Sequence, residues 1–177
     1  MNNAKRAAVA FALALAVTAT GVPSYADSIC TQDEVGDAVR GIDMTGIRLD
    51  NAENAVKIRI YFRDLDRSRI GRMRAQVDTG KPMGYGYFIQ FRRRPAGGFS
   101  KYLERAPMYS EYTGNGIDCK GLKLTWGKDV ADIRLPRACM KRASERVRGE
   151  VFIDNRNETR SDNVPDGALF TQWVRRG

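Results

Sequence analysis

The sequence contains no histidine and only three cysteines among its 177 residues. Without histidine there can be no Ser-His-Asp or Cys-His catalytic unit, no imidazole general base and no zinc site with histidine ligands. The catalytic chemistry that remains possible uses a pair of carboxylates, as in glycosidases. The carboxylates considered for that role are Glu104, Glu111, Asp118 and Asp129. Because they are scattered along the chain, the sequence favours a non-enzymatic protein without a cofactor.

Long hydrophobic runs are also scarce, and the single candidate lies at the N-terminus. Lys5 and Arg6 precede 13 apolar or small residues at 7–19, and Ser24-Tyr25-Ala26 follows with small residues at both ends. This order is typical of a secretory signal peptide. A membrane-spanning helix needs ~20 apolar residues, so the run is too short to serve as an anchor. We therefore predict a signal peptide over residues 1–26, cleavage after Ala26, and a secreted extracellular protein without a membrane span.

Alternation of apolar and polar residues dominates the rest of the chain. The clearest case is Val-Lys-Ile-Arg-Ile-Tyr-Phe-Arg at 56–63, which predicts a half-buried antiparallel strand in a hairpin with 44–49. Further strands are predicted at 72–78, 85–92, 99–104, 122–126, 130–135 and 147–153. Gly, Pro and Asn turns at this spacing favour an all-β fold, an antiparallel β-sandwich of about seven to nine strands, jelly-roll or immunoglobulin-like.

This fold assigns a place to each part of the chain. Residues 27–40 are predicted to be a flexible N-terminal tail, 41–177 a single domain, and 154–166 a polar loop. Trp173, in a short apolar closing segment, is predicted to plug the core. The remaining predicted core residues are Val56, Ile58, Ile60, Phe62, Met73, Val77, Ile89, Phe91, Leu124, Ile133, Leu135, Val151 and Ile153.

Two of the three cysteines are predicted to form a disulfide. If Gly127-Lys128 is a two-residue hairpin loop, paired residue numbers sum to 255 and Cys119 faces Pro136. One helical turn from Pro136 would bring Cys139 back towards Cys119, and export favours oxidation. Cys30 then remains, either idle, paired between molecules or competing for one of the other two.

Basic residues outnumber acidic ones, with 30 Lys+Arg against 21 Asp+Glu, and arginine outnumbers lysine 22 to 8. The alternation places them on the polar faces of three predicted strands, which would form one positive surface if those strands were neighbours in one sheet. Its predicted ligand-binding residues are Lys57, Arg59, Tyr61, Arg63, Arg72, Arg74, Phe88, Arg92 and Arg94. Such a surface suits an anionic polymer or polysaccharide at the cell surface, with nucleic acid less favoured as the physiological partner. A merely solvated face is the alternative.

A metal site has weaker support. Asp154, Asn157, Glu158 and Asp162 offer oxygen ligands of the kind that calcium prefers. Arg156 and Arg160 lie between them, and the spacing is not that of an EF-hand loop. A plain Asn/Asp loop without metal is therefore favoured.

The pattern around the predicted disulfide resembles a known group of proteins. Cys119-Lys120-Gly121, the strand 130–135 and the corner Pro136-Arg137-Ala138-Cys139-Met140 are its signature. Together with the strand pattern at 50–65, these segments are similar to those of small exported proteins of uncharacterised function from high-GC Gram-positive bacteria. The resemblance covers roughly 46–173 and implies a one-disulfide sandwich, similar in outline to carbohydrate-binding sandwiches, but no catalytic residue.

The function predicted from the sequence is that of a secreted, non-enzymatic surface or binding module. Its ligand would be an anionic cell-envelope polymer or polysaccharide held on a basic sheet face. A protein-binding or inhibitory secreted domain is the first alternative, and a carboxylate-based glycoside hydrolase is the second.

Overall fold

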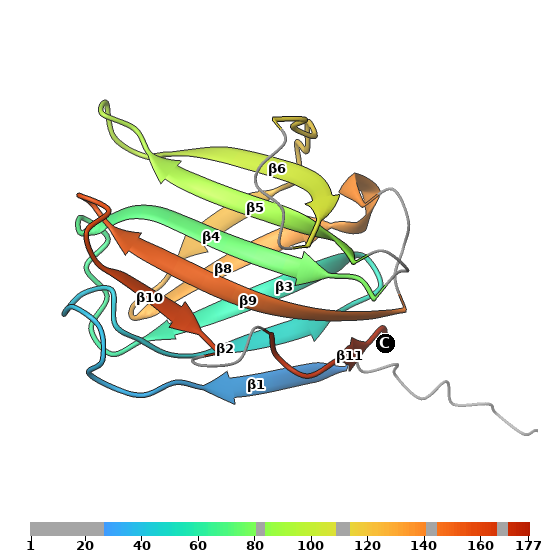
Figure 1. Ribbon diagram of the computed structural model, residues 1–177, viewed down its shortest axis with the longest axis horizontal. Helices are drawn as coiled ribbons and strands as arrows, with labels where there is room; N and C mark the ends of the chain where they lie inside the picture. The colour runs from blue at the N-terminus through green and yellow to red at the C-terminus, as the bar shows by residue number, and fades with distance from the viewer. Residues whose placement is uncertain (1–26, 81–83, 109–113, 141–144, 166–169) are drawn as a thin grey trace, which may run out of the picture.

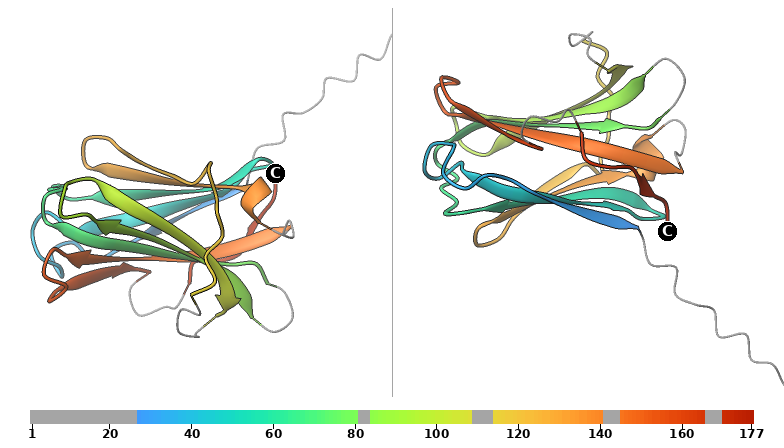
Figure 2. Two further views of the ribbon diagram at one scale, coloured as in Figure 1. Left: turned by 90° about the horizontal axis from the view of Figure 1, so that it is seen from above. Right: turned by 60° about the horizontal axis from the view of Figure 1, so that its bottom comes forward.

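The computed structural model describes residues 27–80, 84–108, 114–140, 145–165 and 170–177. Two antiparallel sheets pack face to face in these residues (Figure 1), and the right view of Figure 2 separates the two layers. The antiparallel β-sandwich predicted from the sequence is confirmed. The predicted signal peptide and Glu111 lie outside the described residues.

The first sheet has five strands. Their spatial order is β1 (Ser28–Gln32), β2 (Met44–Asn51), β3 (Ala55–Phe62), β8 (Val130–Pro136) and β7 (Lys123–Trp126). The second sheet has the order β10 (Ser161–Val164), β9 (Arg146–Asn155), β4 (Ile70–Asp78), β5 (Tyr85–Arg93) and β6 (Phe99–Pro107). A sixth strand, β11 (Val174–Arg175), pairs with β9. No helix among the described residues has the length and apolarity to cross a membrane.

All eight strands predicted from the alternation are present, and three short strands lie in segments predicted otherwise. The prediction of a flexible tail is wrong at β1, which pairs with β2 over its whole length. Ile29 and Thr31 are half-buried while Ser28, Cys30 and Gln32 are exposed, so a five-residue alternation is enough when the edge of β2 is available. The predicted loop at 154–166 likewise contains β10, and the closing segment contains β11.

The core between the sheets matches the prediction closely. Twelve of the thirteen predicted residues are buried in one cluster, and Leu124 packs against it while remaining half-buried. The prediction for Trp173 is wrong, because its ring lies under the guanidinium groups of Arg146 and Arg148, at 4.6 and 4.7 Å from the ring centroid. Its neighbour Val174, in β11, is the residue that enters the core.

The disulfide between Cys119 and Cys139 is confirmed, with their Cα atoms 5.6 Å apart. A short 3₁₀ turn, η1 (Arg137–Cys139), follows Pro136 as the sequence predicts. Cys30 is exposed and is not part of this bond.

The register of the β7–β8 hairpin differs from the prediction by two residues. Trp126 pairs with Ala131, so paired numbers sum to 257, and the Gly127 N–H donates to the Val130 carbonyl at 3.0 Å. Asp129 has a left-handed φ of 50°, and its carbonyl and carboxylate accept from the N–H groups of Phe62 and Leu65. These contacts hold a longer loop against the end of β3. A shift of two residues keeps every side chain on its predicted face.

Candidate functional site

The predicted basic surface is divided between the two sheets. Lys57, Arg59 and Tyr61 lie on β3 in the five-stranded sheet, whereas β4 and β5 belong to the six-stranded sheet. The outer faces of a two-layer sandwich point in opposite directions. The prediction of one continuous surface is therefore wrong, because alternation shows which residues share a strand face but not which strands share a sheet.

The arginines on the six-stranded face are neutralised. Arg72 pairs with Asp154 at 2.7 Å and with Glu158 at 3.2 Å, Arg74 pairs with Asp154 at 3.3 Å, and Arg92 pairs with Glu158 at 3.1 Å. The remaining two predicted arginines lie just beyond strand ends: Arg63 is 3.8 Å from Asp43, and Arg94 is exposed in the β5–β6 turn. This face therefore offers little uncompensated charge to a ligand.

Phe88 is not a stacking surface, which corrects a second part of the prediction. Only 5% of it is exposed, and it forms a small cluster with Ala106, Met108 and Phe170 on the outer side of the six-stranded sheet. Both Phe88 and its neighbour Tyr87 are buried. Alternation predicts an exposed side chain at position 88, but here Met108 and Phe170 cover it.

The four predicted calcium ligands do not converge. Asp154 and Glu158 are engaged by arginines, and Asp162 points to the opposite side of the sheet from Asp154, where it accepts a hydrogen bond from the Met44 N–H at 2.6 Å. One carboxylate oxygen each of Asp162, Asp33 and Asp37 instead lie within 4.8 Å of one another. Burial and the charges of Asp37 and Asp43 raise the pKa of Asp162 to about 6. Nothing in the sequence signals this cluster, because Asp162 lies more than 120 residues beyond Asp33 and Asp37.

The described carboxylates of the predicted hydrolase set lie in different surroundings. Glu104 is fully buried beside the Tyr102 hydroxyl at 2.9 Å, Asp118 is exposed, and Asp129 holds the β7–β8 loop. Glu150, which the sequence did not single out, is 5% exposed, and burial raises its pKa to about 7 against the lowering effect of Arg74 and Arg148.

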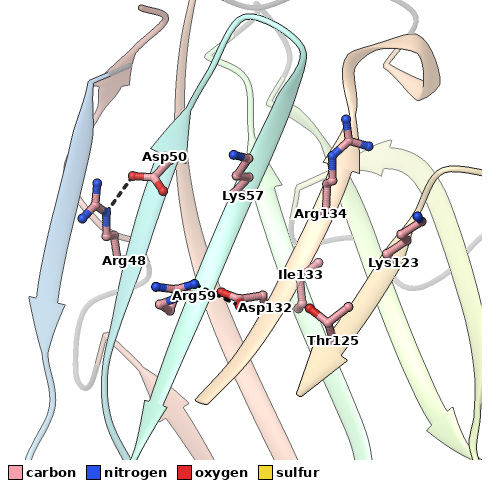
Figure 3. A pocket seen from close by; sticks show the side chains of 9 residues that line it. All are labelled: Arg48, Asp50, Lys57, Arg59, Lys123, Thr125, Asp132, Ile133 and Arg134. Carbon is pink, nitrogen blue, oxygen red and sulfur yellow. Dashed lines mark hydrogen bonds and ion pairs between the residues drawn. The ribbon is translucent and has the colours of Figure 1, made fainter. Parts of the chain in front are cut away.

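The outer face of the five-stranded sheet carries a different arrangement (Figure 3). Its polar side chains form two rows across β2, β3, β8 and β7, and they line a shallow concavity of about 440 Å³. The first row is Asp50, Lys57, Arg134 and Lys123, and the second is Arg48, Arg59, Asp132 and Thr125. Five basic and two acidic side chains leave a formal charge of +3.

Both arginines of the second row are paired with carboxylates, one within the row and one in the first row. Arg59 makes a two-point contact with Asp132 at 2.7 and 3.1 Å, and the Nε of Arg48 is 2.8 Å from a carboxylate oxygen of Asp50. Hydrogen bonding to these carboxylates raises the pKa of both arginines. All four side chains are at least partly exposed, so the pairs fix geometry more than they add stability.

The first row contains three cations on adjacent strands. Lys57 lies opposite Arg134, and Arg134 lies opposite Lys123, with neighbouring strands ~4.8 Å apart. In Figure 3 these three side chains stand on three neighbouring strands with no labelled carboxylate between them, and within the described ranges none of the three forms an ion pair. Like charges directly opposite one another are destabilising. This "cationic row" of Lys57, Arg134 and Lys123 is therefore a place where a bound anion would relieve repulsion.

Sequence reasoning found Lys57 but missed Arg134 and Lys123. A signal was present, because the predicted alternation of 122–126 and 130–135 puts both residues on polar strand faces. What the sequence lacked was the pairing of β8 with β3 rather than with a later strand.

Comparisons with protein-family models, curated proteins and solved structures found no match for this chain.

Proposed function

We propose that this protein is an exported, non-enzymatic binding module that holds an anionic polymer of the cell envelope on the outer face of its five-stranded sheet. The cationic row is the single observation that carries the proposal. Its three uncompensated charges are aligned across the strands, so successive anionic groups of a polymer crossing β3, β8 and β7 would meet one cation each. The ion pairs Arg48–Asp50 and Arg59–Asp132 border the site and hold its shape.

Export is the second part of this proposal. The signal-peptide pattern at 1–26 and the Cys119–Cys139 disulfide support it, because such bonds persist in oxidising compartments. Grouping with the small exported proteins that the Pro136 to Met140 corner resembles belongs to the same proposal. A protein-binding role has less support, because the exposed large apolar side chains among the described residues are Val35 and Val39.

Salt-dependent retention tests the proposed function. The mature protein should bind immobilised teichoic acid or heparin at low ionic strength, and three neutralised anions should weaken binding about 20- to 40-fold between about 50 and about 200 mM salt. Lys57→Glu with Arg134→Glu should abolish retention without unfolding the domain. Arg156→Glu is the matched control, because Arg156 is an exposed arginine in the β9–β10 turn of the other sheet.

Three results would count against the proposal. Retention that does not respond to salt would exclude a charge-based site. Equal retention by the double variant would place binding elsewhere on the molecule. Tighter binding to single-stranded nucleic acid than to envelope polymers would change the class of partner.

A further inference from the structure

The side of the sandwich next to the cationic row has an apolar groove. It lies between the outermost strands of the two sheets, β6 and β7, and has a volume of about 400 Å³, within the range of small-molecule sites. We call it the β6–β7 groove; its apolar lining residues are Phe91, Phe99, Leu122, Leu124 and Trp126. The rings of Phe99 and Trp126 are 5.7 Å apart at their centroids and tilted by 38°.

The opposite side of the sandwich is closed by polar contacts between the sheets. There the Met44 N–H donates to Asp162, and the Asn51 side chain donates to the Val174 carbonyl at 2.9 Å. At the β6–β7 side, Lys101 forms the corresponding link, with its ammonium 3.3 Å from the carbonyls of residues 119, 120 and 122. The link engages the charge of Lys101, and beside it Phe99, Leu124 and Trp126 remain only half-buried.

The groove and the concavity of the sheet face are contiguous. Lys123 and Thr125 line both, because β7 is an edge strand with its odd residues on the outer face and Leu124 and Trp126 on the inner side. A ligand seated on Lys123 can therefore reach the apolar groove by passing around this one strand.

We infer that the β6–β7 groove takes the apolar chain of an anionic amphiphile whose head group binds the cationic row. This inference rests on the proposed function and narrows it, because the anionic ligand would carry an acyl or alkyl chain. The positive charge of Lys123, where the groove meets the cationic row, favours an anionic head group. The groove lining selects a hydrocarbon over a sugar ring, since its polar side chains are Lys101, Lys123 and Thr125, and the ammonium of Lys101 is already engaged.

The energetic expectation follows from the two subsites. Burying each methylene of a chain in an apolar site tightens binding about fourfold. A head group alone should therefore bind far more weakly than the same head group attached to a chain. A chain with an uncharged head group should lack the contribution of the cationic row.

Tryptophan fluorescence can read occupancy of the groove directly. The chain has two tryptophans, so Trp173→Phe leaves Trp126 as the sole reporter. The probes are dodecyl phosphate, inorganic phosphate and dodecyl maltoside, each below its critical micelle concentration. We expect dodecyl phosphate to shift the Trp126 emission at concentrations at least 100-fold lower than phosphate and at least tenfold lower than the maltoside. Calorimetric titration of the unmodified mature protein provides a readout independent of the Trp173 change.

Two variants separate the subsites. Arg134→Glu should weaken dodecyl phosphate binding at least tenfold and leave maltoside binding unchanged, because Arg134 lies opposite Lys123 in the cationic row and does not line the groove. Leu124→Asn should weaken dodecyl phosphate binding about tenfold while leaving retention on a polyanion column unchanged. Arg156→Glu is again the control and should change neither.

The outcomes distinguish this inference from the proposed function. Salt-sensitive polyanion retention with no preference for dodecyl phosphate over phosphate would overturn the amphiphile and leave the proposed function standing. Failure of both kinds of probe would overturn both. Equal affinity for dodecyl phosphate and dodecyl maltoside, or a larger Trp126 response to an acidic polysaccharide, would also overturn the amphiphile.

Discussion

The two outer faces of this sandwich both carry several basic side chains, and they differ in whether all of those named here are paired with carboxylates. On the six-stranded face, Arg72, Arg74 and Arg92 are drawn into ion pairs with Asp154 and Glu158. On the five-stranded face, Lys57, Arg134 and Lys123 are left facing one another. Charge that is paired and partly buried serves the fold, and exposed charge left unpaired is available to a ligand.

The difference arises from what covers each face. The six-stranded face carries buried groups such as Phe88, Glu104 and Glu150, so its charges are partly removed from water. A buried charge needs a partner or a shifted pKa. The five-stranded face remains open to solvent, where repulsion between cations is screened and costs little.

The largest expected effect comes from the two aromatic residues that the sequence assigned to one binding surface. Phe88→Ala should lower the free energy of unfolding by about 3–5 kcal/mol, because it empties the cluster with Met108 and Phe170. Tyr61→Ala, on the half-buried edge of the other face, should cost less than about 1 kcal/mol. Urea denaturation of both variants measures the difference, and equal costs would show that Phe88 is not packed as described.

The second prediction concerns pH and Glu150. Its folded-state pKa of about 7 exceeds its ordinary value of 4.5, so the folded protein retains a proton that the unfolded chain has released between these values. The contribution of Glu150 to stability is therefore lost as pH rises through this window, and the loss is complete above about pH 7. Glu150→Gln should remove it, so that the stability of the variant relative to wild type rises by roughly 3 kcal/mol between pH 4.5 and pH 8.

Urea denaturation of wild type and Glu150→Gln at several pH values would measure this change. Asp162, whose pKa is also raised, is present in both proteins and cancels in the comparison. A difference that stays constant with pH would contradict the burial of Glu150.

The ion pairs of the two faces give a third, smaller contrast. Arg72→Ala should cost about 2 kcal/mol, because it leaves the 7%-exposed carboxylate of Asp154 with Arg74 alone. Arg59→Ala breaks an ion pair with Asp132 whose side chains are 50% and 38% exposed, and should cost less than about 1 kcal/mol. Thermal unfolding of both variants at one pH measures these losses of stability. The loss for Arg72→Ala should be the larger of the two.

The sequence predicted features that depend on residues close to one another along the chain, and it missed those that join residues far apart. Alternation in 56–63 identified the buried residues of β3, and the predicted turn at Pro136 helped to place the disulfide. Both depend on neighbours within about 20 residues. The ion pair between Arg72 and Asp154 spans 82 residues, and the cationic row requires β3 to pair with β8. Strand patterns do not encode those pairings, so the predicted site combined residues from two opposite faces.

The smallest effect gives the sharpest test of the five-stranded face. Lys57→Gln removes one of three like charges and leaves no carboxylate without a partner, so the variant should be as stable as wild type or up to about 0.5 kcal/mol more stable. The gain should shrink from low to high salt, because screening already weakens the repulsion in wild type. The same variant should lose affinity for the polyanion, so that binding and stability change in opposite directions. A loss of stability above about 1 kcal/mol would show that Lys57 has a structural partner and that the row is not uncompensated.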